Sequence, residues 1–280
     1  MNEFLNILME GESIQQKMKK QIQNKIEELL SKEFYCSVEN LNEKNTIFSV
    51  NKNAQQPYIK ILAYRNCVVI CTSENLYSKV HQLLQNKNRD EIFELPLVYG
   101  QTIHYVPDDG AFAGEVRACP GQNTFDDCTG DSIELSDYEY KCLFYEDILS
   151  LRGLTGFENS LAFDENGLTE TKAVFVARDN QQLIGVAGAA ESSMNGVWEV
   201  GIDVKEEYRK AGLGTCLVKK LTKELLMRNI IPFYSASTTN IGSQMVAARC
   251  GYIPCWVDTF GTILDGSSVY NNLIQSFERI

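Results

Sequence analysis

A chain of 280 residues is long enough for two domains, since a globular domain has roughly 150 residues. Its 44% hydrophobic and 22% charged residues are typical of a folded globular protein and exclude an intrinsically disordered chain. The formal net charge of −11 disfavours a generic nucleic-acid-binding protein and a protein held on an anionic membrane surface. No run approaches about 18 uninterrupted apolar residues, which predicts no membrane span.

The start of the chain and the cysteine content indicate the compartment. The first twelve residues contain three glutamates and no Lys or Arg, unlike a secretory signal, so we expect a cytoplasmic protein. Nine scattered cysteines, an odd number, do not form a disulfide framework. Cys67 and Cys71 would share one face of a strand as buried, reduced thiols. With no CxxC pair and only two histidines, no metal site is predicted.

The N-terminal part of the chain mixes helical and strand patterns. Apolar residues at three- and four-residue spacing predict a helix within the first thirty residues and another over Glu74–Gln85. Short β-rich segments predict strands at residues 34–38, 46–50, 58–64 and 67–72. Residues 107–131 predict an irregular connection, whose aspartates we interpret as a solvated loop and not a calcium site. We therefore expect a smaller α+β domain at residues 1–130.

Beyond residue 131 the pattern is more regular and predicts a second domain, residues 131–280. Helices are predicted over Tyr140–Arg152, Gly212–Met227 and Asn240–Arg249. Strands are predicted over Ala173–Ala177, Leu183–Ala190, Trp198–Val204, Phe233–Thr238 and Tyr252–Val257. Alternating strands and helices favour a mixed α/β fold.

One segment between a predicted strand and a predicted helix contains a motif. Arg209 to Gly214 reads R-x-x-G-x-G. Glycine permits positive φ and lets a ligand approach the backbone. The unpaired N–H groups and the positive dipole end of the helix then attract an anion. The spacing predicts a phosphate or pyrophosphate site; the alternative is a helix start whose glycines serve packing.

Two nucleotide-binding patterns are absent, and the charge distribution favours an anionic ligand. A dinucleotide fingerprint would need glycine where the chain has Leu217, and there is no Walker A string. Residues 204–228 contain three acidic and seven basic residues in an otherwise acidic chain. The basic residues are Lys205, Arg209, Lys210, Lys219, Lys220, Lys223 and Arg228. The lysines on the helix are explained equally well as its solvated face.

The motif resembles the acetyl-CoA motif of the GNAT superfamily of N-acetyltransferases, [RQ]-x-x-G-x-[GA] after a strand. A second element, which begins at Asn240-Ile241-Gly242-Ser243 and ends at Gly251-Tyr252, is similar to the family's N-x-x-[AS]-x(7)-G-[FY]. The resemblance covers about residues 140–256 and none of residues 1–130. It implies an α/β fold with a mixed, splayed central sheet flanked by helices.

The resemblance also implies acetyl-CoA as co-substrate, without a metal. Backbone groups of Ile202 and Val204 would bind the pantetheine arm, as a strand edge binds a peptide. Asn240 and Ser243 would reach the cofactor near its pantetheine and thioester end. The residues implied to wrap the pyrophosphate through main-chain N–H groups are Arg209, Lys210, Gly212, Gly214 and Thr215.

The implied reaction is direct transfer of an acetyl group to an amine. A lysine-like amine is protonated at pH 7, and neutralising it costs roughly 4–5 kcal/mol. The resemblance implies Glu199 as the base, with Asp203 second, sharing Glu199's side of the strand only if the strand bulges. The family's proton-donating tyrosine is replaced by Ala247, which leaves Ser243, Tyr252 or solvent as general acid.

We therefore expect an acetyl-CoA-dependent N-acetyltransferase whose acceptor is an amine of a small molecule or peptide. The acidic remainder of the chain favours a cationic acceptor, and the N-terminal domain would shape acceptor access or form a homodimer. The alternative is a non-catalytic acyl-CoA-binding regulatory module, which Ala247 favours. Burial of Glu199 in a tunnel that leads to the thioester would favour the enzyme. A plugged or apolar tunnel would favour the binding module.

Overall fold

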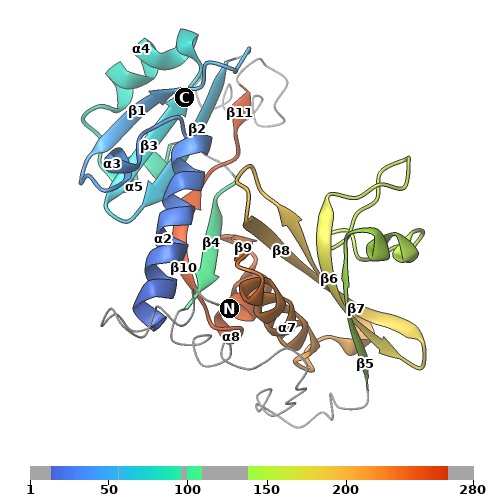
Figure 1. Cartoon of the computed structure of the whole chain (residues 1–280). Helices are drawn as coiled ribbons and strands as arrows, with labels where there is room; N and C mark the ends of the chain where they lie inside the picture. Colours follow the sequence, from blue (N-terminus) through green and yellow to red (C-terminus); the bar gives the residue numbers. More distant parts are fainter. Residues whose placement is uncertain (1–13, 56, 96–99, 109–137, 264–280) are drawn as a thin grey trace. The chain divides into compact units, whose positions relative to one another are not determined.

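The computed structural model describes residues 14–55, 57–95, 100–108 and 138–263 (Figure 1). The chain divides into two compact units that do not follow a single boundary in the sequence. Unit 1 comprises residues 1–25, 105–235 and 241–253; unit 2 comprises residues 26–104, 236–240 and 254–280. In the described parts of both units, strands form a sheet against which helices pack, so the fold is mixed α/β. The predicted boundary at residue 130 lies outside the described residues and stays a prediction.

The first helix is confirmed, whereas the strand expected after it is wrong. Helix α2 (Ile14–Glu33) buries Ile26, Leu29 and Leu30. The chain then turns and forms a short helix, α3 (Val38–Leu41), where residues 34–38 were expected to form a strand. Ser37 caps α3, because its hydroxyl accepts the Asn40 N–H at 3.2 Å and the Asn40 side chain accepts the Ser37 N–H in return. This reciprocal capping box outweighs the β-rich composition.

The other strands and the helix predicted in this part of the chain are confirmed. In unit 2, β3 (Cys67–Thr72) pairs in parallel with β1 (Thr46–Val50) and antiparallel with β2 (Tyr58–Tyr64). Helix α4 (Glu74–Leu84) packs against β1 and β3, and α5 (Arg89–Phe93) is an additional short helix. The side chains buried together in this core are Ile59, Ile61, Val68, Ile70, Leu84 and Ile92. Every residue of β3 is buried, including the unpaired thiols of Cys67 and Cys71, as predicted.

Unit 1 contains an antiparallel run of four strands. They are β5 (Glu139–Phe144), β6 (Thr171–Asp179), β7 (Gln182–Glu191) and β8 (Val197–Val204). The helix predicted over Tyr140–Arg152 is wrong in its first part, because residues 139–144 pair with β6 as a strand. Only residues 145–151 are helical, as the 3₁₀ helix η3 (Tyr145–Leu151). Sheet pairing at the edge of β6 has overridden the helical spacing of the apolar residues.

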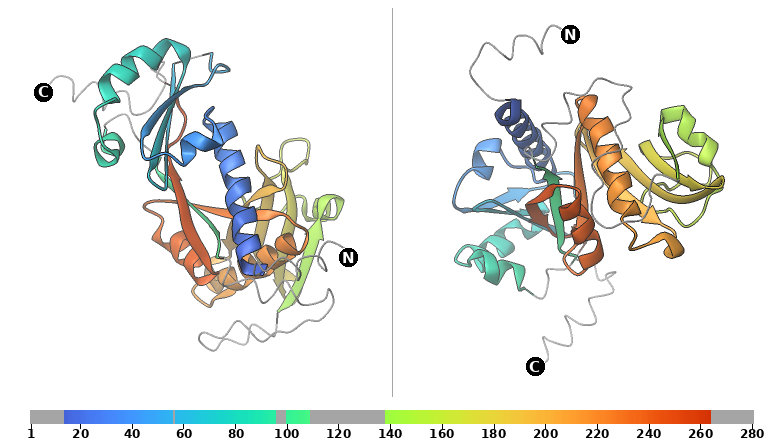
Figure 2. Two further views of the ribbon diagram at one scale, coloured as in Figure 1. Left: turned by 60° about the vertical axis from the view of Figure 1, so that its left-hand side comes forward. Right: turned by 90° about the horizontal axis from the view of Figure 1, so that it is seen from below.

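The remaining elements follow the predicted order. After η4 (Glu206–Tyr208), helix α7 (Leu213–Met227) connects β8 to β9 (Ile231–Ser237), which runs parallel to β8. Helix α7 packs against β6, β7 and β8 along one face of their sheet (Figures 1 and 2). Its inward side chains are Leu213, Leu217, Leu221 and Leu225. Helix α8 (Ile241–Arg249) follows β9.

Three strands contribute residues to both units. They are β4 (Thr102–Pro107), β9 and β10 (Tyr252–Asp258). The Trp256–Asp258 end of β10 pairs with β2, which also pairs with β11 (Thr262–Ile263). None of the helices described combines the length and apolar content that crossing a bilayer requires.

Candidate cofactor-binding site

Strands β8 and β9 diverge halfway along β8. Their parallel pairing ends at Val200 and Tyr234, while β8 continues to Val204 in regular pairing with β7. Lys205 donates its N–H to Ile184 O of β7 at 2.9 Å. Because successive residues of a strand point their N–H and C=O to opposite sides, those of Ile202 and Val204 point away from β7. The two residues predicted to bind pantetheine therefore direct backbone groups to the side on which β9 no longer pairs.

Arg209 has a specific role at this point. Its Nε donates to Val204 O at 2.8 Å, so the side chain satisfies a carbonyl that β9 does not pair. The N–H of Val204 and both backbone groups of Ile202 remain directed to the diverging side. The contact also fixes the guanidinium at the start of the turn that leads into α7.

The R-x-x-G-x-G segment forms a left-handed turn that opens α7. Lys210 and Gly212 have φ values of 64° and 83°. The first intrahelical hydrogen bond runs from Cys216 N–H to Gly212 O at 3.0 Å, so the N–H groups of residues 213–215 have no acceptor within the helix. A Cβ atom placed on Gly212 would meet nothing within 4 Å, so the space beside it is open. Open space at the positive end of a 15-residue helix is the geometry of an anion site.

Two neighbouring contacts position the first turn of α7. A Cβ on Gly214 would lie 3.5 Å from side-chain atoms of Ile202 and Val204, so the helix begins directly against the diverging end of β8. The Cys250 thiol lies 3.4 Å from Thr215 O and links the end of α8 to this turn. The Lys220 ammonium lies over the rings of Tyr140 and Phe175, at 5.3 and 5.9 Å, so this lysine packs against β5 and β6 and is not simply solvated.

The two carboxylates predicted for the base lie on β8. The register of β7 and β8 is regular, so Glu199 and Asp203, four residues apart, share one face of the strand. The prediction that they would share it only through a bulge is wrong. Their surroundings differ, because Glu199 is exposed whereas the Asp203 carboxylate accepts three hydrogen bonds from Asn159 and Ser160. Exposed Glu199 does not meet the burial criterion that would have favoured the enzyme over the binding module.

Ser243 lies on α8 and is hydrogen-bonded to Tyr234 of β9. Burial raises the pKa of Tyr234, and the bond to Ser243 opposes that rise. Sequence reasoning missed Tyr234, because no motif contains it. The sequence feature that comes nearest to indicating Tyr234 is its position in the strand that precedes the second motif.

The other residues of the second motif have different surroundings. Tyr252 is buried, and its hydroxyl lies 2.7 Å from Thr222 Oγ1 of α7; burial raises its pKa well above the usual range. Ala247 is also fully buried, so the position of the family's tyrosine lies on the inner face of α8. Asn240 is exposed directly before α8, and its N–H donates to Ser237 O at 2.9 Å.

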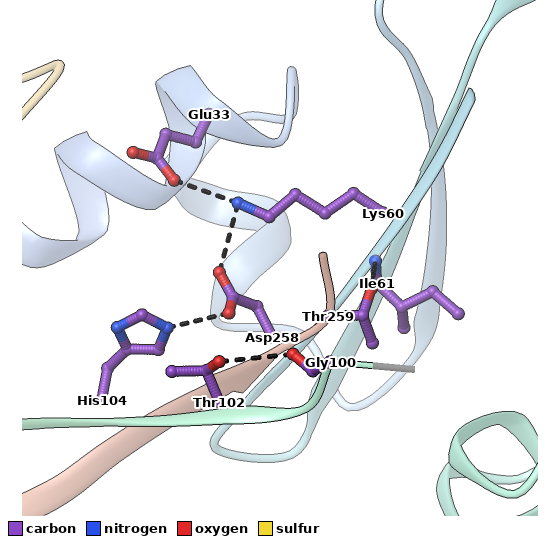
Figure 3. Close-up of polar contacts among 8 residues, drawn as sticks. All are labelled: Glu33, Lys60, Ile61, Gly100, Thr102, His104, Asp258 and Thr259. Carbon is purple, nitrogen blue, oxygen red and sulfur yellow. Dashed lines mark hydrogen bonds and ion pairs between the residues drawn. The ribbon is translucent and has the colours of Figure 1, made fainter. Parts of the chain in front are cut away.

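Unit 2 contains a separate cluster of charged side chains (Figure 3). Lys60 Nζ lies 3.2 Å from Asp258 Oδ2 and 3.5 Å from Glu33 Oε2, and Asp258 Oδ1 lies 2.8 Å from His104 Nε2. The His104 ring stacks on Trp256 with centroids 4.5 Å apart. Burial alone would raise the pKa of Asp258, but His104 and Lys60 outweigh it and hold that pKa below its usual range. Sequence reasoning missed this cluster, whose members come from distant segments.

The cysteines and potential metal ligands add no further centre in the part of the chain that the structure describes. None of the seven cysteines described there forms a disulfide bond, and burial raises the pKa of Cys255 to about 11. A thiol with such a pKa is a poor nucleophile at neutral pH. Within the same ranges no group of three or more His, Cys, Asp or Glu side chains could hold a metal ion. Cys119, Cys128 and the aspartates at 109–131 lie outside the described residues.

A strand that diverges from its parallel neighbour leads into a glycine turn at the start of a long helix, which is a geometry suited to an extended anionic ligand. Residues 147–255 match the family model for GNAT acetyltransferases. This part of the chain is therefore a GNAT acetyltransferase domain, and the resemblance predicted from the two motifs is confirmed. The family implies acyl-CoA-dependent acetyl transfer as the class of reaction.

Similar solved structures include several acetyltransferases. A GNAT-family acetyltransferase from Novosphingobium aromaticivorans has a TM-score of 0.39 and 16% identity, with 57% of this chain and 63% of that chain covered. A GCN5-related N-acetyltransferase-like protein from Streptococcus suis has a TM-score of 0.38 and 13% identity, covering 70% and 71%. A Bacillus subtilis acetyltransferase in complex with CoA has a TM-score of 0.28 and 16% identity, covering 32% and 76%. No curated protein matches the sequence.

Proposed function

We propose that the protein is an acetyl-CoA-dependent N-acetyltransferase that transfers an acetyl group directly to an amine of a small molecule or peptide. One observation supports the proposal above others. Strand β8 loses its β9 partner after Val200 and leads directly to the open, glycine-bearing N-terminus of α7. Unpaired strand groups beside an anion site match the two halves of coenzyme A, an amide-bearing arm and a diphosphate.

The cofactor would lie along the diverging end of β8 and the start of α7. The backbone of Ile202 and the Val204 N–H would bind the amides of pantetheine. The diphosphate would accept hydrogen bonds from the N–H groups of residues 213–215, with Gly212 leaving room for its oxygens. Arg209 and Lys210 would add positive charge at the same turn. Asn240 and Ser243 would bind nearer the thioester.

The reaction would proceed by direct attack of the neutral amine on the thioester carbonyl. Glu199 would accept the proton that the amine loses, the new C–N bond would form, and the C–S bond would break. The leaving thiolate would take a proton from Ser243, whose hydroxyl is hydrogen-bonded to Tyr234, or from solvent. Tyr252 suits a packing role better, because its hydroxyl is held by Thr222 in the core.

The second candidate is a non-catalytic acyl-CoA-binding module, and one observation favours it. Ala247 is fully buried where the family's pattern has a proton-donating tyrosine.

A cationic amine would be the preferred acceptor of the enzyme, since the chain carries a net charge of −11.

The cofactor site is tested by Gly212→Trp, with Gly196→Trp as the matched control. Both glycines have positive φ, 83° and 77°, and open space where a Cβ would project, so both substitutions impose similar backbone strain. Only Gly212 lies at the start of α7. We expect titration calorimetry to show at least a 100-fold loss of acetyl-CoA affinity for Gly212→Trp alone, equivalent to about 2.7 kcal/mol. Equal acetyl-CoA affinities of the two variants would contradict a cofactor site at this turn, provided that circular dichroism shows both variants to be folded.

Catalysis is tested with a panel of amines and detection of released thiol. We expect Glu199→Gln to lower turnover by about 10²–10⁴-fold, the usual contribution of a general base, with acetyl-CoA affinity within about twofold of wild type. Unaltered turnover would remove Glu199 from the mechanism. A wild-type protein that binds acetyl-CoA and acetylates no amine of the panel would favour the binding module.

A further inference from the structure

A pair of glycines faces each other across β7 and β8 where β9 stops pairing with β8. Gly188 and Gly201 are register partners. A Cβ placed on Gly188 would lie 1.7 Å from Ser160 O, and one on Gly201 would lie 2.0 Å from Asn159 O. Any other residue at either position would collide with main chain, which cannot move aside as a flexible side chain does. The backbone of residues 159–160 therefore lies directly on the two strands.

The Asp203 carboxylate binds the same two residues, Asn159 and Ser160. Asp203 is the next residue after Gly201 on that face of β8. It accepts Asn159 Nδ2 at 2.7 Å, the Ser160 N–H at 2.8 Å and the Ser160 hydroxyl at 2.8 Å. Three donors on one carboxylate form a strong, directional attachment, because a hydrogen bond to a charged acceptor is stronger than a hydrogen bond between neutral groups.

The segment that Asp203 holds is itself fixed in the core of unit 1. Phe157 and Leu161, on either side of the fastened pair, are buried in the hydrophobic cluster that also contains Ile148 and Val186. The Thr171 hydroxyl lies 3.3 Å from Ser160 O and adds a contact from β6. Residues 157–161 are thus a rigid support for β8.

The support lies on the strand face opposite to α7. Gly201 and Asp203 point to one face, and Ile202 and Val204, which contact the start of α7, point to the other. Residues 201–204 have β7 on one edge and no β9 pairing on the other. The strand must nevertheless present its backbone to a ligand in a fixed place, since small displacements of a positioning element lose much of its effect.

We propose that Asp203, Asn159 and Ser160 form a clamp that holds the diverging end of β8 in position for the cofactor. Asp203 is a positioning residue in this arrangement and touches neither cofactor nor acceptor. The inference rests on the proposed function, because it assigns the clamp to the cofactor site. It gives Asp203 a role other than that of the alternative base, since its carboxylate already accepts three hydrogen bonds.

A residue swap separates the clamp from a catalytic role. Asp203→Asn turns an amide toward the amide of Asn159, and Asn159→Asp turns a carboxylate toward the Asp203 carboxylate. Each single variant should raise the dissociation constant and KM for acetyl-CoA about tenfold, the effect of losing one charge-assisted hydrogen bond, with kcat within about threefold. The double variant Asp203→Asn with Asn159→Asp restores a donor opposite an acceptor and should return the dissociation constant to within about threefold of wild type.

Three results would overturn the clamp. They are unchanged acetyl-CoA affinity in both single variants, no recovery in the double variant, and a collapse of kcat at constant KM in Asp203→Asn, which would make Asp203 the base. Ser160→Ala removes only the hydroxyl, which lies 2.8 Å from Asp203 Oδ2 and 3.1 Å from Phe157 O, and it serves if a single variant fails to fold. Its affinity loss should be smaller than tenfold and detectable.

Amide hydrogen exchange distinguishes failure of the clamp from failure of the proposed function. In the full-length protein without ligand, exchange of the amides at positions 201 and 203, which face β7, should be faster in Asp203→Asn than in wild type and should slow again in the double variant. A wild-type protein that does not bind acetyl-CoA would refute the proposed function, and exchange would still test the clamp. Unchanged exchange in Asp203→Asn would refute the clamp while acetyl-CoA binding by wild type upheld the cofactor site.

Discussion

The turn that opens α7 in unit 1 and the charged cluster of unit 2 use polar groups in opposite ways. At the turn, the N–H groups of residues 213–215 have no acceptor within the helix, and the space beside Gly212 is open. In the cluster, Lys60, Asp258 and His104 pair with one another, and Glu33 compensates the lysine (Figure 3). The turn has the electrostatics of a binding site, and the cluster has those of a structural tie.

This difference shows why charged residues alone do not locate a site. The cluster contains a histidine, an aspartate and a lysine within hydrogen-bonding distance, which a search for catalytic side chains would select first. Its groups are already satisfied by each other. The proposed site depends mainly on main-chain groups that the fold leaves unsatisfied, and a ligand gains most where protein partners are missing.

Among the effects that distinguish the charged cluster from the turn, the largest is expected for Lys60→Met, on the unfolding free energy of unit 2. Removing the lysine leaves His104 as the remaining partner of the buried Asp258 carboxylate, and breaking one pair of a buried cluster costs about 3 kcal/mol of unfolding free energy. The chain has two tryptophans, Trp198 in unit 1 and Trp256 in unit 2, so a Trp198→Phe background makes denaturant-induced fluorescence changes report on unit 2.

Acetyl-CoA affinity of Lys60→Met should remain within about twofold of wild type, because the cluster contributes nothing to the proposed site. Exposed Lys52 of the same unit provides the control, with a change in unfolding free energy below about 0.5 kcal/mol for Lys52→Met. Equal stability of the Lys60 and Lys52 variants would contradict the assignment of the cluster as a structural tie.

A smaller effect should appear in the pH dependence of unit 2. The folded-state pKa of Asp258 lies below its unfolded value, so its contribution to stability is complete above the unfolded pKa. That contribution is lost as the pH falls through the folded-state pKa, because the unfolded chain binds the proton first. Unfolding free energies of unit 2 measured between neutral pH and about pH 3 should fall less steeply in Asp258→Asn than in wild type. Identical slopes would show that Asp258 is not held ionised by His104 and Lys60.

The smallest effect concerns the strained backbone of the turn. Lys210 has φ of 64°, which costs a side-chain-bearing residue about 1 kcal/mol. Lys210→Gly should therefore raise the unfolding free energy of unit 1 by up to that amount and weaken acetyl-CoA binding about threefold through loss of the cation. Asn229→Gly, with φ of 58° at the other end of α7, should give part of the stabilisation without loss of affinity. A Lys210→Gly variant with unaltered affinity would show that the lysine takes no part in binding.

The sequence predicted the local elements wherever one pattern was dominant. Helix α7, strands β7 and β8, and the turn between β8 and α7 followed from apolar spacing and from R-x-x-G-x-G. Two segments were predicted wrongly, residues 34–38 and 140–144. A capping box decided the first and pairing with β6 decided the second, so neighbours outweighed composition in both.

By itself the sequence determined the family and the glycine turn that opens α7, because a glycine pattern and a helix start are local properties of consecutive residues. Only the tertiary structure decided which carboxylate of β8 is exposed, that Arg209 occupies the Val204 carbonyl, and that Tyr234 bonds to Ser243. It also brought Asn159 and Ser160 onto Gly188, Gly201 and Asp203. These contacts join residues distant in the chain, and their partners are chosen by packing and register, which no short sequence window contains.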